Sequence, residues 1–380
     1  FGHNQTAQAV AALLDKGTTS MTRQQVQDRL DELRTELGVT SSPGGVTITL
    51  KSRRDELPAA IALVVDLLRN PVFPADAFDE LRRGALSGIE QQREDPRAVA
   101  RNAIDRLGNP YPRGDVRYSA TFGELAEDYN ALTIDQIRAF HARFYGLGSA
   151  EFAAVGDMDP AAVRDALRSA FADWKQGAPF SRIAQPLVDV KPEQLMLATP
   201  DKPNANMLVR VSVPLNDNDV DYAALTMANH LLGGGGSARL WKRIREGEGL
   251  SYDVRSRIDW NNIDPNSQWQ ASAIFAPQNR GKVEAAFREE VARALKDGFT
   301  AEELSEGKSS LLSFRRLSRA QDGAIAFGLA NNLYLDRTFA ISAQVDEAIG
   351  KLTLEQVNAA LRKYVTPASF VSVFAGDFKP

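Results

Sequence analysis

The sequence contains no cysteine among its 380 residues, so disulfide bonds, thiolate catalysis and cysteine-ligated zinc are excluded. It contains only three histidines, His3, His141 and His230, and no two of them stand in a His-x-x-Glu-His or His-x-x-x-His pattern. A catalytic zinc needs three protein ligands, so we expect no metal site made by this chain alone. No apolar run is long enough to span a bilayer.

Basic residues are not in excess either. The 45 lysines and arginines against 49 aspartates and glutamates leave a net charge of −4 without a basic cluster, which argues against a nucleic-acid-binding protein. The segment GGGGSAR at 233–239 lacks the lysine of a phosphate-binding P-loop, and no G-x-S-x-G serine elbow occurs. The first ten residues lack the layout of a secretory signal. The chain therefore offers no self-contained catalytic machinery, and nothing in it indicates a nucleotide, haem or flavin.

What the sequence does contain is an internal duplication. Residues 132–160 align without gaps with residues 352–380, and both segments predict a capped helix, a short turn, a strand and a Gly-Asp close that ends in proline. Other blocks recur in the same order, among them 73–78 with 299–304, where Thr300 and Glu303 predict a capping box. We therefore expect two homologous copies, at 1–174 and 195–380, joined by an aperiodic linker at 175–194.

The second copy predicts its own elements most clearly. Apolar runs predict strands at 195–199 and 207–214, and a helix starts at Tyr222. After a glycine turn, Ser237 is expected to cap another helix, followed by a hairpin at 250–260 and 269–275, further helices and a closing strand. This order predicts an α+β fold, a mainly antiparallel sheet with helices packed on one face. Only four residues precede the first helix of the first copy, so we expect that copy to lack its opening strands and the chain to be cut from a longer one.

The stretch from Gly233 to Tyr252 has the most distinctive chemistry. Four glycines end one helix, at Gly233, Gly234, Gly235 and Gly236. Arg245 and Tyr252 then stand seven residues apart, on either side of a tight passage from helix to strand. A guanidinium and a phenol held there can grip a backbone carbonyl. From the residues alone, the more ordinary alternative is a solvated helix charge beside a half-buried strand tyrosine.

The run GGGGSARLWKRIREGEGLSYDV at 233–254, the paired V-G-D and A-G-D closings and the doubled α+β copies resemble the pitrilysin/insulinase family of zinc metallopeptidases. The resemblance covers nearly the whole chain. It implies tandem α+β domains of the fold shared by LuxS and the mitochondrial processing peptidases. It also implies two halves that close like a clamshell around the substrate.

Active members of that family carry His-x-x-Glu-His on the first helix of the first domain and a further zinc-binding glutamate downstream. When this chain is aligned with those members through the segment Leu13–Thr18, neither copy keeps a complete set of zinc ligands. In the first copy the motif falls on Gln8, Ala11 and Ala12, and the further glutamate would lie near Ser87 or Gly88. In the second copy the motif falls on Thr226, Asn229 and His230. The resemblance thus implies the inactive C-terminal half of such an enzyme, with no cofactor of its own and zinc in the partner half.

In the family the last domain of the inactive half supplies an arginine and a tyrosine, spaced as in R-x-x-x-x-x-x-Y, that reach the substrate beside the zinc. Arg245 and Tyr252 match that spacing, so the resemblance implies that they bind substrate. It also implies a catalytic partner half, unfolded peptide substrates that add as a strand to a sheet edge, and a periplasmic or otherwise exported location. Two alternatives stay open, namely a degenerate structural core subunit and a stand-alone module that binds extended peptides without proteolysis.

Overall fold

The computed structural model describes residues 4–174 and 177–378, so His3, the closing Pro380 and part of the predicted linker lie outside the described residues. By contacts the chain divides into two units. Unit 1 consists of Phe1–Glu90 and Tyr111–Ile183, and unit 2 of Gln91–Pro110 and Ala184–Pro380. Among the described residues, no helix combines the length and the apolar composition needed to cross a bilayer.

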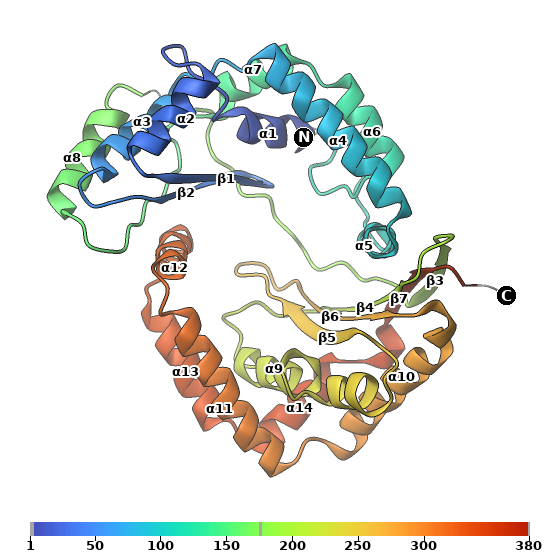
Figure 1. The fold of residues 1–380 in the computed structure, drawn as a ribbon. Helices are drawn as coiled ribbons and strands as arrows, with labels where there is room; N and C mark the ends of the chain where they lie inside the picture. Colours follow the sequence, from blue (N-terminus) through green and yellow to red (C-terminus); the bar gives the residue numbers. More distant parts are fainter. Residues whose placement is uncertain (1–3, 175–176, 379–380) are drawn as a thin grey trace. The chain divides into compact units, whose positions relative to one another are not determined.

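Unit 2 is built on a five-stranded sheet with the order β3-β7-β4-β6-β5 (Figure 1). Strand β3 pairs with β7 in parallel, and all other neighbours are antiparallel, which confirms the predicted mainly antiparallel sheet. The strands are β3 (Glu193–Ala198), β4 (Ala205–Val213), β5 (Asp253–Asp259), β6 (Ser267–Phe275) and β7 (Val371–Gly376).

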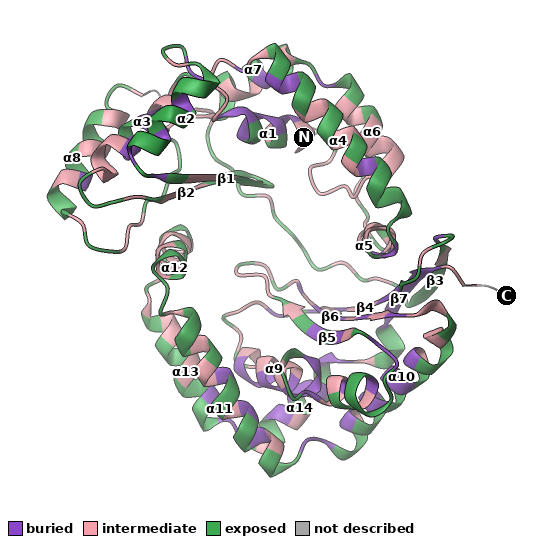
Figure 2. Cartoon of the chain, viewed as in Figure 1, coloured by how far each residue is buried: buried purple, intermediate pink, exposed green. Residues whose placement is uncertain are grey.

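Helices cover one face of this sheet because the side chains along each strand point alternately to its two faces, and one of these faces is apolar. Along β4, Met207, Val209 and Val211 are buried against the helices, while Arg210 points to the opposite face. The main core of the unit forms there, and Figure 2 shows its buried residues gathered where helices and sheet meet. The helices of unit 2 on this side are α9 (Tyr222–Asn229), α10 (Arg280–Asp297), α11 (Ala301–Ser318), α13 (Ala340–Lys351) and α14 (Leu354–Tyr364).

A helix from the first copy covers part of the other face. Helix α5 (Pro96–Arg106) belongs to unit 2 by its contacts, although it lies far from the sheet in sequence. Its Ala100 and Ile104 are buried against Val371 and Val373 of β7. The apolar half of this face is therefore closed by α5, and the half formed by β6 and β5 stays polar.

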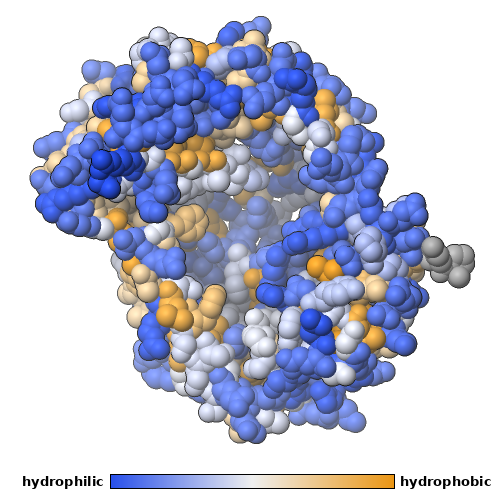
Figure 3. All heavy atoms as spheres, viewed as in Figure 1, coloured by the Kyte–Doolittle hydropathy of each residue, from blue (hydrophilic) through white to orange (hydrophobic). Residues whose placement is uncertain are grey.

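Helix α12 (Asp322–Tyr334) differs from the other α-helices of unit 2 because it has no buried residue. Its Phe327 and Leu333 are exposed, as are Phe314 and Leu317 at the end of α11. The surface in Figure 3 is mainly hydrophilic, with apolar patches near the end of unit 2 where α12 and α13 lie.

Unit 1 has a small sheet of two antiparallel strands, β1 (Glu36–Ser42) and β2 (Gly45–Lys51). Helices surround it and form three small cores. They are α1 (Asn4–Leu13), α2 (Arg23–Glu32), α3 (Leu57–Arg69), α4 (Ala75–Glu94), α6 (Phe122–Ala131), α7 (Ile134–Phe144) and α8 (Pro160–Phe171). The strand predicted within 132–160 is wrong, since residues 151–155, which align with β7, pair with no described strand. Its counterpart β7 forms because β3 and β4 flank it, and unit 1 has no such neighbours among the described residues.

The capping boxes at the starts of helices form in both copies. Thr133 with Gln136 and Thr353 with Gln356 form the same capping box at the start of α7 and α14 (Leu354–Tyr364). The predicted box of Thr300 with Glu303 at the start of α11 is confirmed as well. These boxes need only four consecutive residues, so the sequence specifies them directly.

Candidate functional site

The glycine stretch is held tightly against the edge strand β5. Helix α9 continues into a π-helical turn, η1 (His230–Gly234), which ends where the Gly235 N–H donates to the His230 carbonyl at 2.8 Å. A β-carbon added at Gly233 would lie 2.5 Å from Ser256 Oγ and 2.7 Å from Ser256 N on β5. Glycine is needed here because any side chain would collide with that backbone.

The next helix is also π-helical, η2 (Trp241–Gly247). The prediction that Ser237 caps it is wrong, because Ser237 lies in a turn and the helical residues begin at Arg239. Arg239 fixes that start instead, through two bonds of 2.7 Å to the Glu303 carboxylate and one of 2.8 Å to the Gly298 carbonyl. Single π-helical turns within helices are frequent at functional sites.

Arg245 lies on η2 with its side chain in solvent. Its guanidinium carbon lies 5.9 Å from the ring centroid of Trp241, and within the described residues it pairs with no carboxylate. The neighbouring Arg243 is different, because its donors are taken by Glu248 at 2.9 Å and Glu289 at 2.6 Å. Arg245 thus keeps its hydrogen-bond donors available, while Trp241 supports the side chain by a cation–π contact.

Tyr252 stands at the other end of the passage, directly before β5. Its backbone N–H donates to the Ile274 carbonyl at 2.8 Å, and the buried Ser251 hydroxyl lies 2.7 Å from the same carbonyl. These contacts fix the backbone, yet the Tyr252 residue is 62% exposed. Its hydroxyl makes no hydrogen bond to any described residue, so the structure places two free donors, Arg245 and Tyr252, on the two sides of one short surface passage.

Two of the three positions that match the metal motif in the second copy, Asn229 and His230, are occupied by internal hydrogen bonds. Ser256 Oγ donates to Asn229 Oδ1 at 2.7 Å, and Asn229 Nδ2 lies 3.4 Å from the Ser256 carbonyl. His230 Nε2 lies 2.6 Å from Ser310 Oγ, and burial lowers the pKa of His230. Thr226 supplies only a hydroxyl. These side chains close the end of α9 against β5 and α11 rather than leaving a ligand set open.

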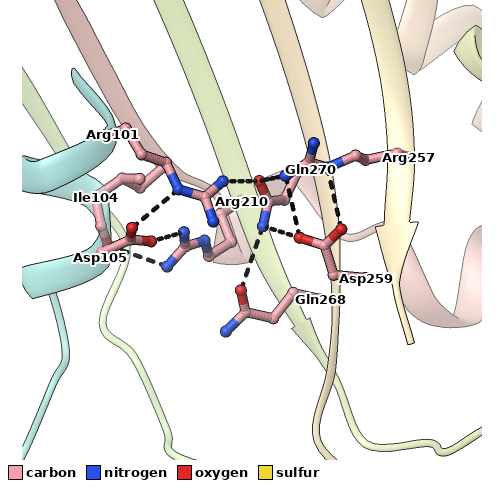
Figure 4. Close-up of polar contacts among 8 residues, drawn as sticks. All are labelled: Arg101, Ile104, Asp105, Arg210, Arg257, Asp259, Gln268 and Gln270. Carbon is pink, nitrogen blue, oxygen red and sulfur yellow. Dashed lines mark hydrogen bonds and ion pairs between the residues drawn. The ribbon is translucent and has the colours of Figure 1, made fainter. Parts of the chain in front are cut away.

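A polar cluster on the open face of the sheet was missed by sequence reasoning (Figure 4). At its centre Arg210, whose side chain is 12% exposed, donates to the Ile104 carbonyl at 3.1 Å and pairs with Asp105. Arg101 Nε donates to the same Asp105 carboxylate at 2.9 Å. The available signal was Arg210 itself, a charge within the apolar run 207–214.

The cluster continues across the sheet to β5. Gln270, buried to 6% exposure, donates to Asp259 at 2.7 Å, and Arg257 Nε lies 3.0 Å from the other oxygen of that carboxylate. Gln270 Oε1 accepts from Arg101 Nη1 at 3.0 Å and from Arg257 Nη2 at 3.5 Å. One neutral amide oxygen therefore accepts hydrogen bonds from two guanidinium groups, one on α5 and one on β5.

Comparison with known proteins shows what this arrangement is similar to. Residues 131–311 match the family model described as the peptidase M16 inactive domain. A non-peptidase homolog from Helicobacter pylori, YmxG, is 21% identical over 362 residues, which cover 94% of this chain and 81% of that protein. Over residues 131–311 the chain is therefore similar to the inactive domain of the M16 zinc peptidases. An uncharacterized zinc protease of Mycobacterium leprae is 26% identical over 91% of this chain and 77% of its own length.

Solved structures share the fold. A peptidase M16 inactive domain from Pseudomonas fluorescens superposes with a TM-score of 0.84 at 22% identity, over 98% of this chain and 87% of that one. The periplasmic protease PqqL from Escherichia coli superposes with a TM-score of 0.75 at 14% identity, over 99% of this chain but only 41% of that one. The predicted α+β fold and the predicted resemblance to this peptidase family are confirmed.

The positions of the first copy that the sequence analysis aligned with the zinc motif hold no histidine or carboxylate. Ala11 is buried and Ala12 exposed on α1, and Gln8 Oε1 accepts from the Tyr129 hydroxyl at 3.3 Å. Across the described parts of the chain, no three histidine, aspartate or glutamate side chains are grouped to hold a metal ion. Of the six aligned positions, only His230 holds a side chain that commonly binds zinc.

Proposed function

We propose that this chain is the non-catalytic half of a zinc metallopeptidase and completes a peptide-degrading chamber when joined to a half that carries His-x-x-Glu-His. The observation that carries the proposal is the pair of free, exposed donors at Arg245 and Tyr252. The match to the M16 inactive domain supports it, as does the coverage of only 41% of the PqqL chain, which leaves room for a second half in that protein.

Peptide hydrolysis explains why such donors are needed. A zinc ion held by the partner half would supply an activated water and polarise the peptide carbonyl. Negative charge then develops on the substrate oxygen, and donors aimed at it or at the adjacent substrate backbone lower the barrier. Arg245 brings a permanent charge, and Tyr252 a neutral hydroxyl. Each well-placed donor contributes about 3 kcal/mol to the transition state.

The partners follow from the same proposal. The chain binds the catalytic M16 half, in the same polypeptide or as a separate subunit, and the two halves together take unfolded peptides. An extended peptide offers the backbone carbonyls that Arg245 and Tyr252 recognise, whatever its sequence. We place the protein in the periplasm or another exported compartment, and the likeness to a periplasmic protease supports this.

The test combines the chain with its catalytic half and measures single-turnover cleavage of an unfolded peptide. Arg245→Ala and Tyr252→Phe should each lower the rate about 100-fold while the zinc content stays unchanged. Arg316→Ala is the matched control, because Arg316 is also exposed and makes no ion pair among the described residues. Wild-type cleavage rates in both variants would contradict the proposal.

A second candidate is a subunit that holds peptides or stabilises an assembly without proteolysis. The name of the H. pylori relative, a non-peptidase homolog, favours it. The same reconstituted complex separates the two functions. A zinc-free complex that binds peptides and never cleaves them supports the second candidate, and zinc-dependent cleavage rules it out.

A further inference from the structure

Two cations converge on one neutral atom on the open face of the unit 2 sheet (Figure 4). Arg101 reaches Gln270 Oε1 from α5 and Arg257 reaches it from β5, at 3.0 Å and 3.5 Å. Guanidinium groups this close repel one another, and the neutral amide compensates only part of that repulsion. Such an arrangement is favourable when an anion binds between the two groups.

The carboxylates of the cluster do not balance its arginines. Three arginines, Arg101, Arg210 and Arg257, share two carboxylates, Asp105 and Asp259. The most buried of the three, Arg210, shares Asp105 with Arg101, each arginine contacting a different oxygen of the carboxylate. Each arginine contacts a carboxylate, but the three arginines and two aspartates leave the cluster with one net positive charge.

Donors of both outer arginines remain available. Nη2 of Arg101 and Nη1 of Arg257 have no acceptor in the described part of the chain. The side chains of Arg101 and Arg257 are 44% and 60% exposed, while Gln270 beneath them is 94% buried. The site is thus a fixed polar floor with two guanidinium groups above it that solvent can reach.

We propose that Arg101 and Arg257 form a subsite for a carboxylate of an extended peptide. This rests on the proposed function and narrows its substrate class to peptides that carry an acidic side chain or a free C-terminus at this place. A planar carboxylate with two oxygens fits between two guanidinium forks better than a spherical anion does.

The position along β5 sets a spacing. Arg257 follows Tyr252 by five residues, so the subsite lies roughly 17 Å along the strand from the tyrosine, at about 3.3 Å per residue. A peptide held by Arg245 and Tyr252 and extended along β5 therefore brings a carboxylate about five residues away to Arg257. The subsite selects peptides by an acidic group at that distance from the gripped carbonyl.

The experiment uses the full chain without its catalytic half and three fluorescently labelled, otherwise neutral peptides of about ten residues. The first has one glutamate and an amidated C-terminus, the second has glutamine in its place and a free C-terminus, and the third has glutamine and an amidated C-terminus. Fluorescence anisotropy gives the three affinities. We expect one or both carboxylate peptides to bind about tenfold tighter than the third, and the difference to shrink as salt is raised.

Arg257→Gln and Arg101→Gln should each reduce the preference to within about twofold. Arg257→Gln leaves α5 untouched, so its result does not depend on the packing of that helix. Arg288→Gln is the matched control, since Arg288 is 46% exposed on α10 and pairs with Glu284. Preference for the first peptide identifies an acidic side chain as the ligand, and preference for the second identifies a C-terminus.

Equal affinity for all three peptides would overturn the proposal, as would a preference that survives Arg257→Gln. The result is separable from that of the cleavage assay. A carboxylate preference together with unaffected cleavage in the Arg245 and Tyr252 variants would refute the proposed half-enzyme and keep the subsite.

Discussion

Asn229 and Ser256 join the end of α9 to the edge strand of the sheet. Ser256 Oγ donates to Asn229 Oδ1 at 2.7 Å, and the amide of Asn229 reaches back to the Ser256 carbonyl at 3.4 Å. The Ser256 carbonyl of β5 thereby accepts a hydrogen bond from a side chain of the same unit. Asn229, which the sequence analysis aligned with the glutamate of the zinc motif, thus makes a structural contact that holds the glycine turn.

The first prediction concerns that turn. Gly233→Ala should destabilise the chain by about 1–3 kcal/mol, because the new β-carbon would lie 2.7 Å from the Ser256 backbone nitrogen. Urea denaturation measures the free energy of unfolding. Gly236→Ala is the control, since a β-carbon there meets no atom within 4 Å, and should change stability by less than about 0.5 kcal/mol. Equal effects of the two variants would contradict the close packing of η1 on β5.

The second prediction concerns Arg337, which binds two loops at once. It donates to both oxygens of Asp217 at 2.8 Å and to the Asn262 carbonyl at 2.7 Å, and the two side chains are only 14% and 18% exposed. Arg337→Ala should cost about 3 kcal/mol in urea denaturation, because it leaves the Asp217 carboxylate largely buried and unpaired.

The double variant Arg337→Leu with Asp217→Leu tests that reason. It removes both charges, so it should be less destabilised than Arg337→Ala alone. If the single and double variants lose the same stability, the cost comes from lost packing rather than from the unpaired carboxylate.

The third prediction is a pH dependence. Burial lowers the pKa of His141 below its usual 6.5, against the opposing hydrogen bond of 2.7 Å to the Leu68 carbonyl, and burial lowers the pKa of His230 as well. Between the folded pKa and 6.5 the unfolded chain binds more protons than the folded one. The stability from these neutral histidines is therefore complete above about pH 6.5 and decreases as the pH falls toward the folded pKa.

Urea denaturation at several pH values between about 7 and 5 checks this. The loss of stability on acidification should be smaller in His141→Gln and in His230→Gln than in the wild type, and smallest in the double variant. Identical slopes in wild type and double variant would show that other groups cause the dependence.

Much of the second copy could be predicted from its sequence because its signals are local. A capping box needs four residues, a buried strand shows as an apolar run, and a glycine cluster ends a helix. The structure has β4 at Ala205–Val213, the helix start at Tyr222 and a box at Thr300 with Glu303, all where the sequence predicted them. The spacing of Arg245 and Tyr252 was visible for the same reason.

The sequence failed where the outcome depended on a distant partner. Residues 151–155 have the composition of a strand, but a strand forms only when neighbours accept its hydrogen bonds. The start of η2 is set by Arg239 with Glu303, 64 residues away, and not by the adjacent Ser237.

By itself, then, the sequence determined the α+β fold class and the Arg245/Tyr252 spacing, because each depends on residues close together in the chain. Only the tertiary structure decided that α5 packs on the second copy's sheet and that Arg101 meets Gln270 across 169 residues. A charged residue on a strand predicts a solvent-exposed face of the sheet, and only the packed structure shows which elements cover that residue and which side chains contact it.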